Sequence, residues 1–151
     1  MWPQSRGEQM NRAKRMIETI YYHFINVNPK NKFGGDCVIR AIAHATGQTW
    51  EQTIREMTEL GIKMGFVCND DHVIKKYLEQ KGFTQCNEPR NHLNKKLSVK
   101  EFIDNSNMTE LYKTRIVAIV GSHHVTSIIK GQVHDIWNCS DRTMHRYWAK
   151  K

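Results

Sequence analysis

The spacing of hydrophobic positions changes along this chain, and each spacing predicts a different kind of element. In residues 8–24 the apolar side chains recur at near-helical intervals, which predicts an amphipathic helix. The segment 26–36 breaks every periodicity and is dense in Asn, Pro and Gly, so we expect a loop there. Residues 37–46 are almost wholly apolar, and a helix of that composition is a buried one.

Capping residues predict where the helices begin and end. Asp36 and Gly47 are the expected N-cap and C-terminal stop of the helix 37–46. Two capping-box spacings mark further helix starts, and an Asn-Asp pair marks another. These signals predict helices from Thr49 to about Leu60, from Asn69 or Asp70 to about Gln80 ahead of Gly82, and from Ser98 to about Asn105.

The last third of the chain consists of short runs of β-branched and aromatic residues separated by turn residues. Four strands are expected, at residues 115–120, 125–129, 133–137 and 143–148. Helices followed by an antiparallel meander predict an α+β fold, with N-terminal helices packed on a C-terminal antiparallel sheet. Because no repeat or linker divides the sequence, residues 1–151 are expected to form a single domain.

Composition and charge narrow the function classes. Hydrophobic residues make up 39% of the chain and charged residues 25%, as in ordinary globular proteins. No apolar run approaches the roughly 18 residues of a membrane span. Residues 1–7 lack the features of a secretory signal, so we expect no membrane association and a cytoplasmic location. The net charge of +8 is scattered and accompanies no nucleic-acid-binding motif, so a solvated surface is favoured over nucleic acid as a partner.

The four cysteines are far apart, and none forms a Cys-x-x-Cys pair. Without an export signal, free thiols are expected rather than disulfides. Two pairings resemble metal ligands, Cys68 with His72 and His134 with Cys139. Structural zinc sites normally combine two tight ligand pairs, and that pattern is absent, so no metal or other cofactor is expected.

Cys37 differs from the other cysteines because it opens the predicted buried helix, directly after Gly-Gly-Asp. A helix N-terminus carries unpaired N–H groups and a partial positive charge, which favours a thiolate and can stabilise an oxyanion. The dipole alone supplies only about 0.3–1 kcal/mol, so an imidazolium is also needed. Taken alone, a buried free cysteine is more often a small core side chain.

The predicted hairpin selects His124 rather than its neighbour His123 as that imidazole. If Lys130-Gly131 is a two-residue tip, strand alternation places His124 and Asp135 on one face as diagonal neighbours, and His123 on the other. A loop of three residues would reverse this choice. Asp135 would orient the imidazole, and the other ring nitrogen would take the proton from Cys37.

Trp137 is predicted on the same face as His124 and Asp135, where it would shield them from water. Asn138 is an alternative orienting residue but falls on the opposite face in this register. Each of the three polar residues has an ordinary structural explanation when taken singly. Their order along the chain and their shared face favour a Cys37–His124–Asp135 catalytic triad.

The run from Gly35 to Ala41 (GDCVIRA), followed by His124 and Asp135 on either side of Gly131, resembles papain-like cysteine peptidases. The resemblance is closest to small phage and bacterial members and to bacteriocin-leader peptidases. It covers residues 28–47 and 115–148, and leaves 60–114 unmatched. It implies a papain-like domain, and a hydrolase that cleaves a peptide, isopeptide or other amide bond through a thioester. It further implies a protein or peptide substrate, and a phage protein directed at a host component.

The same family places an oxyanion side chain a few residues before the cysteine. The resemblance implies Asn31 for that role, or secondly Asn28, although the family residue is usually the longer Gln. Deamidation or transglutamination of glutamine side chains would use the same triad. The alternative function is a non-catalytic binding protein on the same fold, with a basic surface that engages nucleic acid or an acidic protein. That alternative predicts binding that weakens steeply with salt and an activity that survives loss of the Cys37 thiol.

Overall fold

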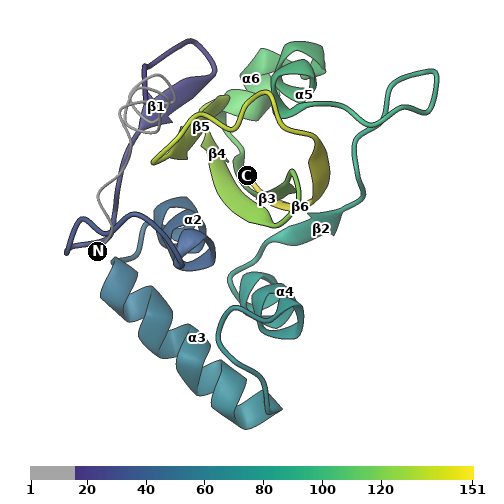
Figure 1. Cartoon of the computed structure of the whole chain (residues 1–151). Helices are drawn as coiled ribbons and strands as arrows, with labels where there is room; N and C mark the ends of the chain where they lie inside the picture. Colours follow the sequence, from purple (N-terminus) through teal and green to yellow (C-terminus); the bar gives the residue numbers. More distant parts are fainter. Residues whose placement is uncertain (1–15) are drawn as a thin grey trace.

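The computed structural model describes residues 16–151, which form a mixed α+β fold (Figure 1). Within that range there are five helices and a six-stranded sheet. The helices are α2 (Cys37–Thr46), α3 (Trp50–Met64), α4 (Asp71–Gln80), α5 (Val99–Asn105) and α6 (Met108–Tyr112). The strands are β1 (Tyr22–Phe24), β2 (Thr84–Cys86), β3 (Arg115–Val120), β4 (His124–Ile129), β5 (Gln132–Asp135) and β6 (Met144–Lys150).

The sheet has the strand order β1-β5-β4-β3-β6-β2. Its central strands β5, β4, β3 and β6 pair antiparallel, as the sequence predicted, whereas β1 pairs parallel to β5. The predicted meander is wrong for the last strand, because β6 pairs with β3 instead of following β5. At the hairpin tip Lys130 and Gly131 have φ angles of 52° and 72°. Two positive φ angles in succession are characteristic of a tight two-residue hairpin, and Ile129 pairs with Gln132 across it. The predicted hairpin register is therefore confirmed.

Helices cover both faces of the sheet (Figure 1). The α2–α4 group packs on one face, where its core includes Val117, Val125 and Trp148 from the sheet. Helices α5 and α6 pack on the other face with alternate residues of the same strands, among them Ile116 and Ile128. Alternate residues of β3 therefore pack into two different cores, which explains why the strand is apolar from Ile116 to Val120.

The structure confirms three of the helix starts that the capping residues predicted. Thr49, Asp70 and Ser98 each accept a hydrogen bond from a backbone N–H of the following helix, and Ser98 completes a capping box with Glu101. Gly47 ends α2 in the left-handed region, as predicted.

Asp36 is an exception to those capping signals. It occupies the N-cap position of α2, but its side chain makes no capping bond to the helix. Its carboxylate instead accepts bonds from Arg40, Asn28 and Trp50.

Two other expectations were incomplete. The helix predicted for 8–24 is wrong over residues 16–24, none of which is helical. Residues 22–24 form strand β1, whose pairing partner lies more than a hundred residues away. The part of that helix before residue 16 lies outside the described residues. Strand β2 and helix α6 were not predicted, and α3 continues to Met64 rather than ending near Leu60.

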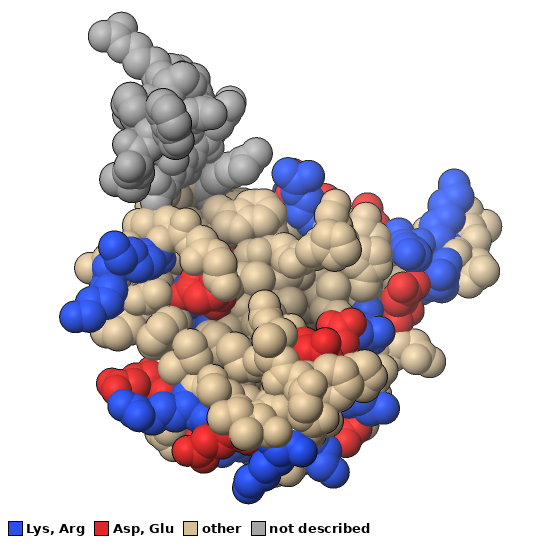
Figure 2. Space-filling view, turned by 60° about the horizontal axis from the view of Figure 1, so that its bottom comes forward, with Lys and Arg blue, Asp and Glu red and all other residues tan. Residues whose placement is uncertain are grey.

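No helix in residues 16–151 combines the length and apolar character needed to cross a membrane. The charges on the face shown in Figure 2 lie mainly around its edge, with acidic side chains among the Lys and Arg side chains. Basic and acidic side chains are thus intermixed on this face, and the even spread of the net charge of +8 over the whole surface stays a prediction.

Candidate active site

The candidate site lies at one end of the sheet, where β4 begins and β5 ends. Because these strands are antiparallel, their first and last residues, His124 and Asp135, are neighbours. Helix α2 packs against β4 and begins with Cys37, which lines a small hollow together with Val125 and Asp135. The structure therefore brings together the three residues that the sequence singled out.

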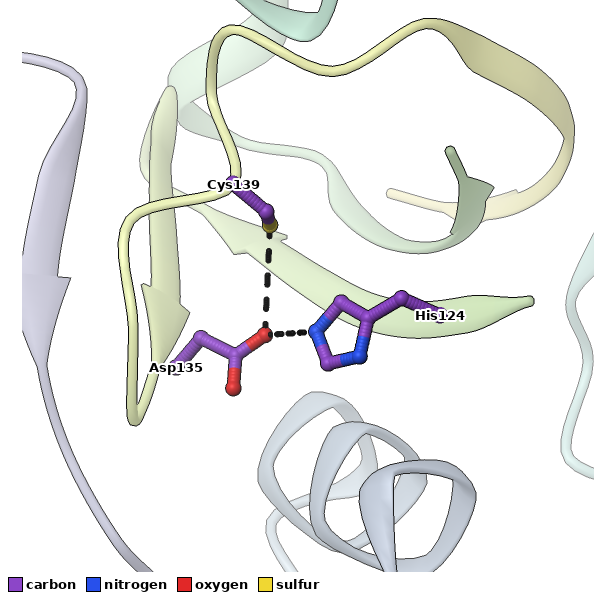
Figure 3. A group of neighbouring side chains, drawn as sticks. All are labelled: His124, Asp135 and Cys139. Atoms are coloured by element: carbon purple, nitrogen blue, oxygen red, sulfur yellow. Dashed lines mark hydrogen bonds and ion pairs between the residues drawn. The ribbon is translucent and has the colours of Figure 1, made fainter. Parts of the chain in front are cut away.

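His124 and Asp135 form a short hydrogen bond. Nε2 of the His124 ring lies 2.6 Å from Oδ2 of Asp135. The second ring nitrogen, Nδ1, faces the ribbon of α2 in Figure 3. Asp135 thereby fixes the orientation of the ring and leaves Nδ1 for the thiol side of the site.

Trp137 lies against the His124 ring, with 4.8 Å between the ring centroids. This is the position expected from the strand register. The indole covers one side of a histidine whose side chain is 17% exposed. Such cover protects the bond between His124 and Asp135 from competition by water.

The Asp135 carboxylate is 4% exposed and is held by several donors. Oδ2 also accepts a 2.6 Å hydrogen bond from the Thr126 hydroxyl. The Cys139 thiol donates a longer hydrogen bond to the same oxygen, with 3.9 Å between sulfur and oxygen. Oδ1 accepts the backbone N–H of Ile136 at 2.7 Å and lies 3.8 Å from a guanidinium nitrogen of Arg40. A buried carboxylate with this many donors is held in one orientation.

These neighbours strongly favour the imidazolium form of His124. Burial by itself would lower the pKa of the ring, but the interactions with Asp135, Cys139 and Cys37 outweigh it and raise the pKa to about 11. His124 is therefore protonated at neutral pH, with its positive charge stabilised mainly by the Asp135 carboxylate.

The Cys37 thiol is affected in the complementary direction. Burial by itself would raise its pKa, but the His124 ring, the backbone N–H of Val125 and the charge of Arg40 outweigh burial and lower the pKa below 9.0. The first N–H groups of α2 are also not capped by Asp36. A thiolate at Cys37 thus has an imidazolium, a guanidinium and unpaired helix N–H groups around it.

Two hollows adjoin the site and share Ser122, His123 and His145 as a common wall. One, of about 510 Å³, is lined by Cys37. The other, of about 780 Å³, is lined by His124 and Trp137. The sulfur and the imidazole therefore each lie at the wall of a hollow.

The structure does not bring the two oxyanion candidates into this arrangement. Asn31 is exposed, has a φ of 53°, and lines neither hollow that Cys37 lines. Asn28 is buried, but its side-chain amide donates to Asp36 and its carbonyl oxygen accepts from Lys30. The oxyanion role of Asn31 stays a prediction, and the N–H groups that begin α2 offer such donors beside the sulfur.

Figure 3 shows the one group of potential metal ligands found among residues 16–151, formed by His124, Asp135 and Cys139. Two ligands of a single tetrahedral zinc ion lie about 3.3 Å apart, given zinc–ligand bonds of about 2.0–2.2 Å. The 2.6 Å between His124 and Asp135 leaves no room for an ion between them. Burial also raises the pKa of the Cys139 thiol, which disfavours the thiolate that a metal requires. The arrangement fits a hydrogen-bonded cluster better than a metal site.

Sequence reasoning missed Arg40, Thr126 and Cys139. Thr126 could have been predicted from the hairpin register, because extending the observed strand pairing by one residue places it opposite Asp135. Arg40 carried a signal too, because it is the one charged residue in the apolar run 37–46. A charge in a buried helix requires a partner. Cys139 lies in the segment between β5 and β6, where spacing gave no guide.

The chain was compared with protein-family models, with curated proteins and with solved structures, and none of the three comparisons gave a match.

Proposed function

We propose that this protein is a cysteine hydrolase that cleaves a peptide, isopeptide or other amide bond, with Cys37 as nucleophile, His124 as acid and base, and Asp135 as the orienting residue. The observation that supports the proposal most directly is the pairing of a thiol of lowered pKa with a histidine of raised pKa, held by a buried carboxylate. This combination is what an activated thiol needs and what a structural cysteine does not.

The proposed reaction has two steps. The Cys37 thiolate attacks the carbonyl carbon, and the negative oxygen is stabilised by the N–H groups at the start of α2. The tetrahedral intermediate collapses when the His124 imidazolium gives its proton to the leaving nitrogen, which departs as an amine and leaves a thioester on Cys37. Water then attacks the thioester while His124 accepts a proton, and the products are a carboxylic acid and the free thiol.

The two hollows suit this sequence of events. The leaving nitrogen has to lie near His124, so the leaving part of the substrate would occupy the 780 Å³ hollow beside Trp137. The acyl part would occupy the 510 Å³ hollow that Cys37 lines. Attack by an amine instead of water in the second step would give transglutamination, and a glutamine side chain as substrate would give deamidation. That the chain is a phage protein acting on a host component stays a prediction.

Selective alkylation tests the activated thiol. At pH 6 a short exposure to iodoacetamide, followed by peptide mapping, is expected to label Cys37 at least about tenfold faster than Cys68 or Cys86, because only thiolates react and each pKa unit is a factor of ten. The His124→Gln variant should lose this advantage. Equal labelling of the three cysteines in the wild-type protein would refute the proposal.

A second measurement tests acyl transfer itself. Incubation with p-nitrophenyl acetate is expected to leave an acetyl group on Cys37, detected by mass spectrometry before it is hydrolysed. The Cys37→Ala variant should carry none, while Cys68→Ala should behave as wild type. The non-catalytic alternative, a basic binding protein, predicts no acylation and no effect of Cys37→Ala on binding.

A further inference from the structure

Arg40 is an unusual residue for the middle of a buried helix. It lies on α2, three positions after Cys37, and is only 6% exposed. One guanidinium nitrogen contacts Oδ1 of Asp36, and another lies 3.8 Å from Oδ1 of Asp135. Arg40 therefore links the residue immediately before the nucleophile to the carboxylate that orients His124.

Charges of alternating sign run through the site as a result. In order of contact they are Asp36, Arg40, Asp135, His124 and Cys37. We propose that Arg40 is a positioning residue of the active site, which holds the Asp135 carboxylate turned towards His124 and so sets the charge around Cys37. This inference rests on the proposed hydrolase function.

Asp135 shows why a cation is needed on its far side. Its Oδ2 serves His124 and Thr126, whereas its Oδ1 faces Arg40 and the N–H of Ile136. Burying a negative charge is unfavourable unless a positive charge and hydrogen-bond donors compensate it. The guanidinium compensates the charge without competing for the oxygen that His124 uses.

Arg40 also affects the ionisation of the Cys37 sulfur. Its positive charge is among the influences that favour the Cys37 thiolate. Without Arg40 the remaining site would carry two carboxylates and a thiolate against one imidazolium. Since the surroundings are largely buried, like charges would then disfavour ionisation of the thiol.

Several other polar groups lie close enough to influence the same titration. His44 of α2 and His134 of β5 line one small hollow with Cys37 and Arg40, and the two imidazoles are 2.8 Å apart. Cys139 approaches Asp135 from the segment after β5, and the Trp50 indole of α3 donates to Asp36.

Burial and the charges around them lower the pKa of both His44 and His134, so both are neutral at neutral pH. Arg40 is thus the cation of this buried group besides His124. The 510 Å³ hollow that Cys37 also lines adds Asp71, Glu88, His123, His145 and Arg146, and there Arg146 pairs with Asp71.

A purely structural ion pair and a positioning residue predict different results. Loss of a structural ion pair would lower the amount of folded protein but leave the pH dependence of Cys37 alkylation where it was. Loss of a positioning residue would move the midpoint of that dependence to higher pH. Arg40→Met removes the charge and keeps the apolar stem, whereas Arg40→Lys keeps a charge that cannot bind both carboxylates at once.

The experiment is a pH series of iodoacetamide alkylation of Cys37, read by peptide mapping, for the wild type and both variants. We expect Arg40→Met to raise the midpoint by about one pH unit, which slows alkylation at pH 6 about tenfold, and Arg40→Lys to lie between. Circular dichroism reports folding. Arg55→Met, which removes an exposed ion pair with Glu51 on α3, is the matched control and should alkylate as the wild type does.

An unchanged midpoint in folded Arg40→Met would overturn the inference while leaving the hydrolase proposal intact. A wild-type midpoint at the ordinary value for a thiol would instead refute the hydrolase proposal. Should Arg40→Met not fold, Asp36→Asn gives the answer, because it removes the competing carboxylate and leaves Arg40 to Asp135 and Cys37. The midpoint is then expected to fall, and a rise would count against the role of Arg40.

Discussion

At the scale of single residues, Asp135 determines the electrostatics of the site. It is acceptor to a ring nitrogen, a hydroxyl, a thiol and a backbone N–H, and it lies beside a guanidinium. The raised pKa of His124 depends on this carboxylate more than on any other favourable contact. Substitutions of Asp135 and of its neighbours therefore test the site one interaction at a time.

Asp135→Asn removes the charge but keeps the shape of the side chain. The pKa of His124 should fall from about 11 towards its ordinary value of 6.5, because the counter-charge is lost. Alkylation of Cys37 at pH 6 should then slow at least about tenfold. The His124 ring signals, followed by NMR against pH, measure the first effect directly. Asp141→Asn, which removes an exposed carboxylate from the same 780 Å³ hollow, is the control and should change neither quantity appreciably.

Thr126→Val replaces the hydroxyl that donates to Asp135 by a methyl group of similar size. The buried carboxylate oxygen then loses one of its donors, and hydrogen bonds to charged groups contribute about 1.5–3 kcal/mol. We expect the free energy of unfolding, measured by urea titration, to fall by roughly that amount. Thr58→Val on the exposed side of α3 should stay within about 0.5 kcal/mol of wild type. A loss no larger than that of the control would show that the hydroxyl does not support the carboxylate.

At the scale of elements, the C-terminal end of α3 depends on the absence of a side chain at Gly61. The carbonyl oxygen of Gly61 accepts the N–H groups of Gly65 and Phe66, so the chain folds back over the last turn. A Cβ at position 61 would overlap the carbonyl oxygen of Phe66. The helix therefore ends as it does because a glycine lies on its inner side one turn earlier.

Gly61→Ala should reverse the usual effect of such a substitution. Alanine in a helix is normally better than glycine by about 0.8–1 kcal/mol, but here the added methyl group collides with backbone and should cost about 1–3 kcal/mol overall. Thermal and urea unfolding measure the change. Glu59→Ala, an exposed position on the same helix, is the control for helix propensity alone. A stabilised Gly61→Ala variant would contradict the predicted collision.

The elements that sequence predicted well are those whose signals are local. The start of α5 was marked by Ser98 and Glu101, and the β4–β5 hairpin by Lys130-Gly131, so neither needed knowledge of distant residues. Strand β1 is the opposite case. Tyr22 is fully buried, and its hydroxyl donates to the backbone oxygen of Asp135, so it is a strand because of a partner far along the chain. Its helix-like spacing of apolar residues could not reveal that.

The candidate site likewise has one part that local sequence signals predict and one part that depends on distant contacts. The shared face of His124 and Asp135 came from strand alternation across a short hairpin, which is a local argument. The contact of Arg40 with Asp135 depends on how α2 docks on the sheet, which no sequence pattern specified. The roles of Cys37, His124 and Asp135 in catalysis remain a proposal that the experiments above decide.

At the scale of the whole molecule, the stability of the folded state depends on pH through two groups of the site, and the two dependences have opposite signs. His124 has a raised pKa, so the folded state keeps a proton that the unfolded chain releases above pH 6.5, and stability from this group is lost as pH rises towards about 11. Cys37 has a lowered pKa, so stability from this group is complete above 9.0 and is lost as pH falls through the folded-state pKa. Between the folded-state pKa of Cys37 and 9.0 the two effects oppose each other.

Cys37→Ala removes one of the two opposing effects and so exposes the other. In the variant, the His124 contribution should decline with pH without compensation, by at most about 1.4 kcal/mol for each pH unit. The difference in unfolding free energy between wild type and Cys37→Ala should therefore grow in favour of wild type between pH 7 and pH 8.5, by up to about 2 kcal/mol. Urea titrations at the two pH values measure it, and other titrating groups cancel in the comparison.

Ala41→Gly provides the control for that experiment, because it also weakens α2 but removes no titrating group. Its difference from wild type should be the same at both pH values. If the difference for Cys37→Ala is equally constant, the thiol has the same pKa in the folded and unfolded states. In that case α2 would bury a cysteine without activating it. A growing difference would instead show that folding itself supplies the free energy that keeps the sulfur ionised beside His124.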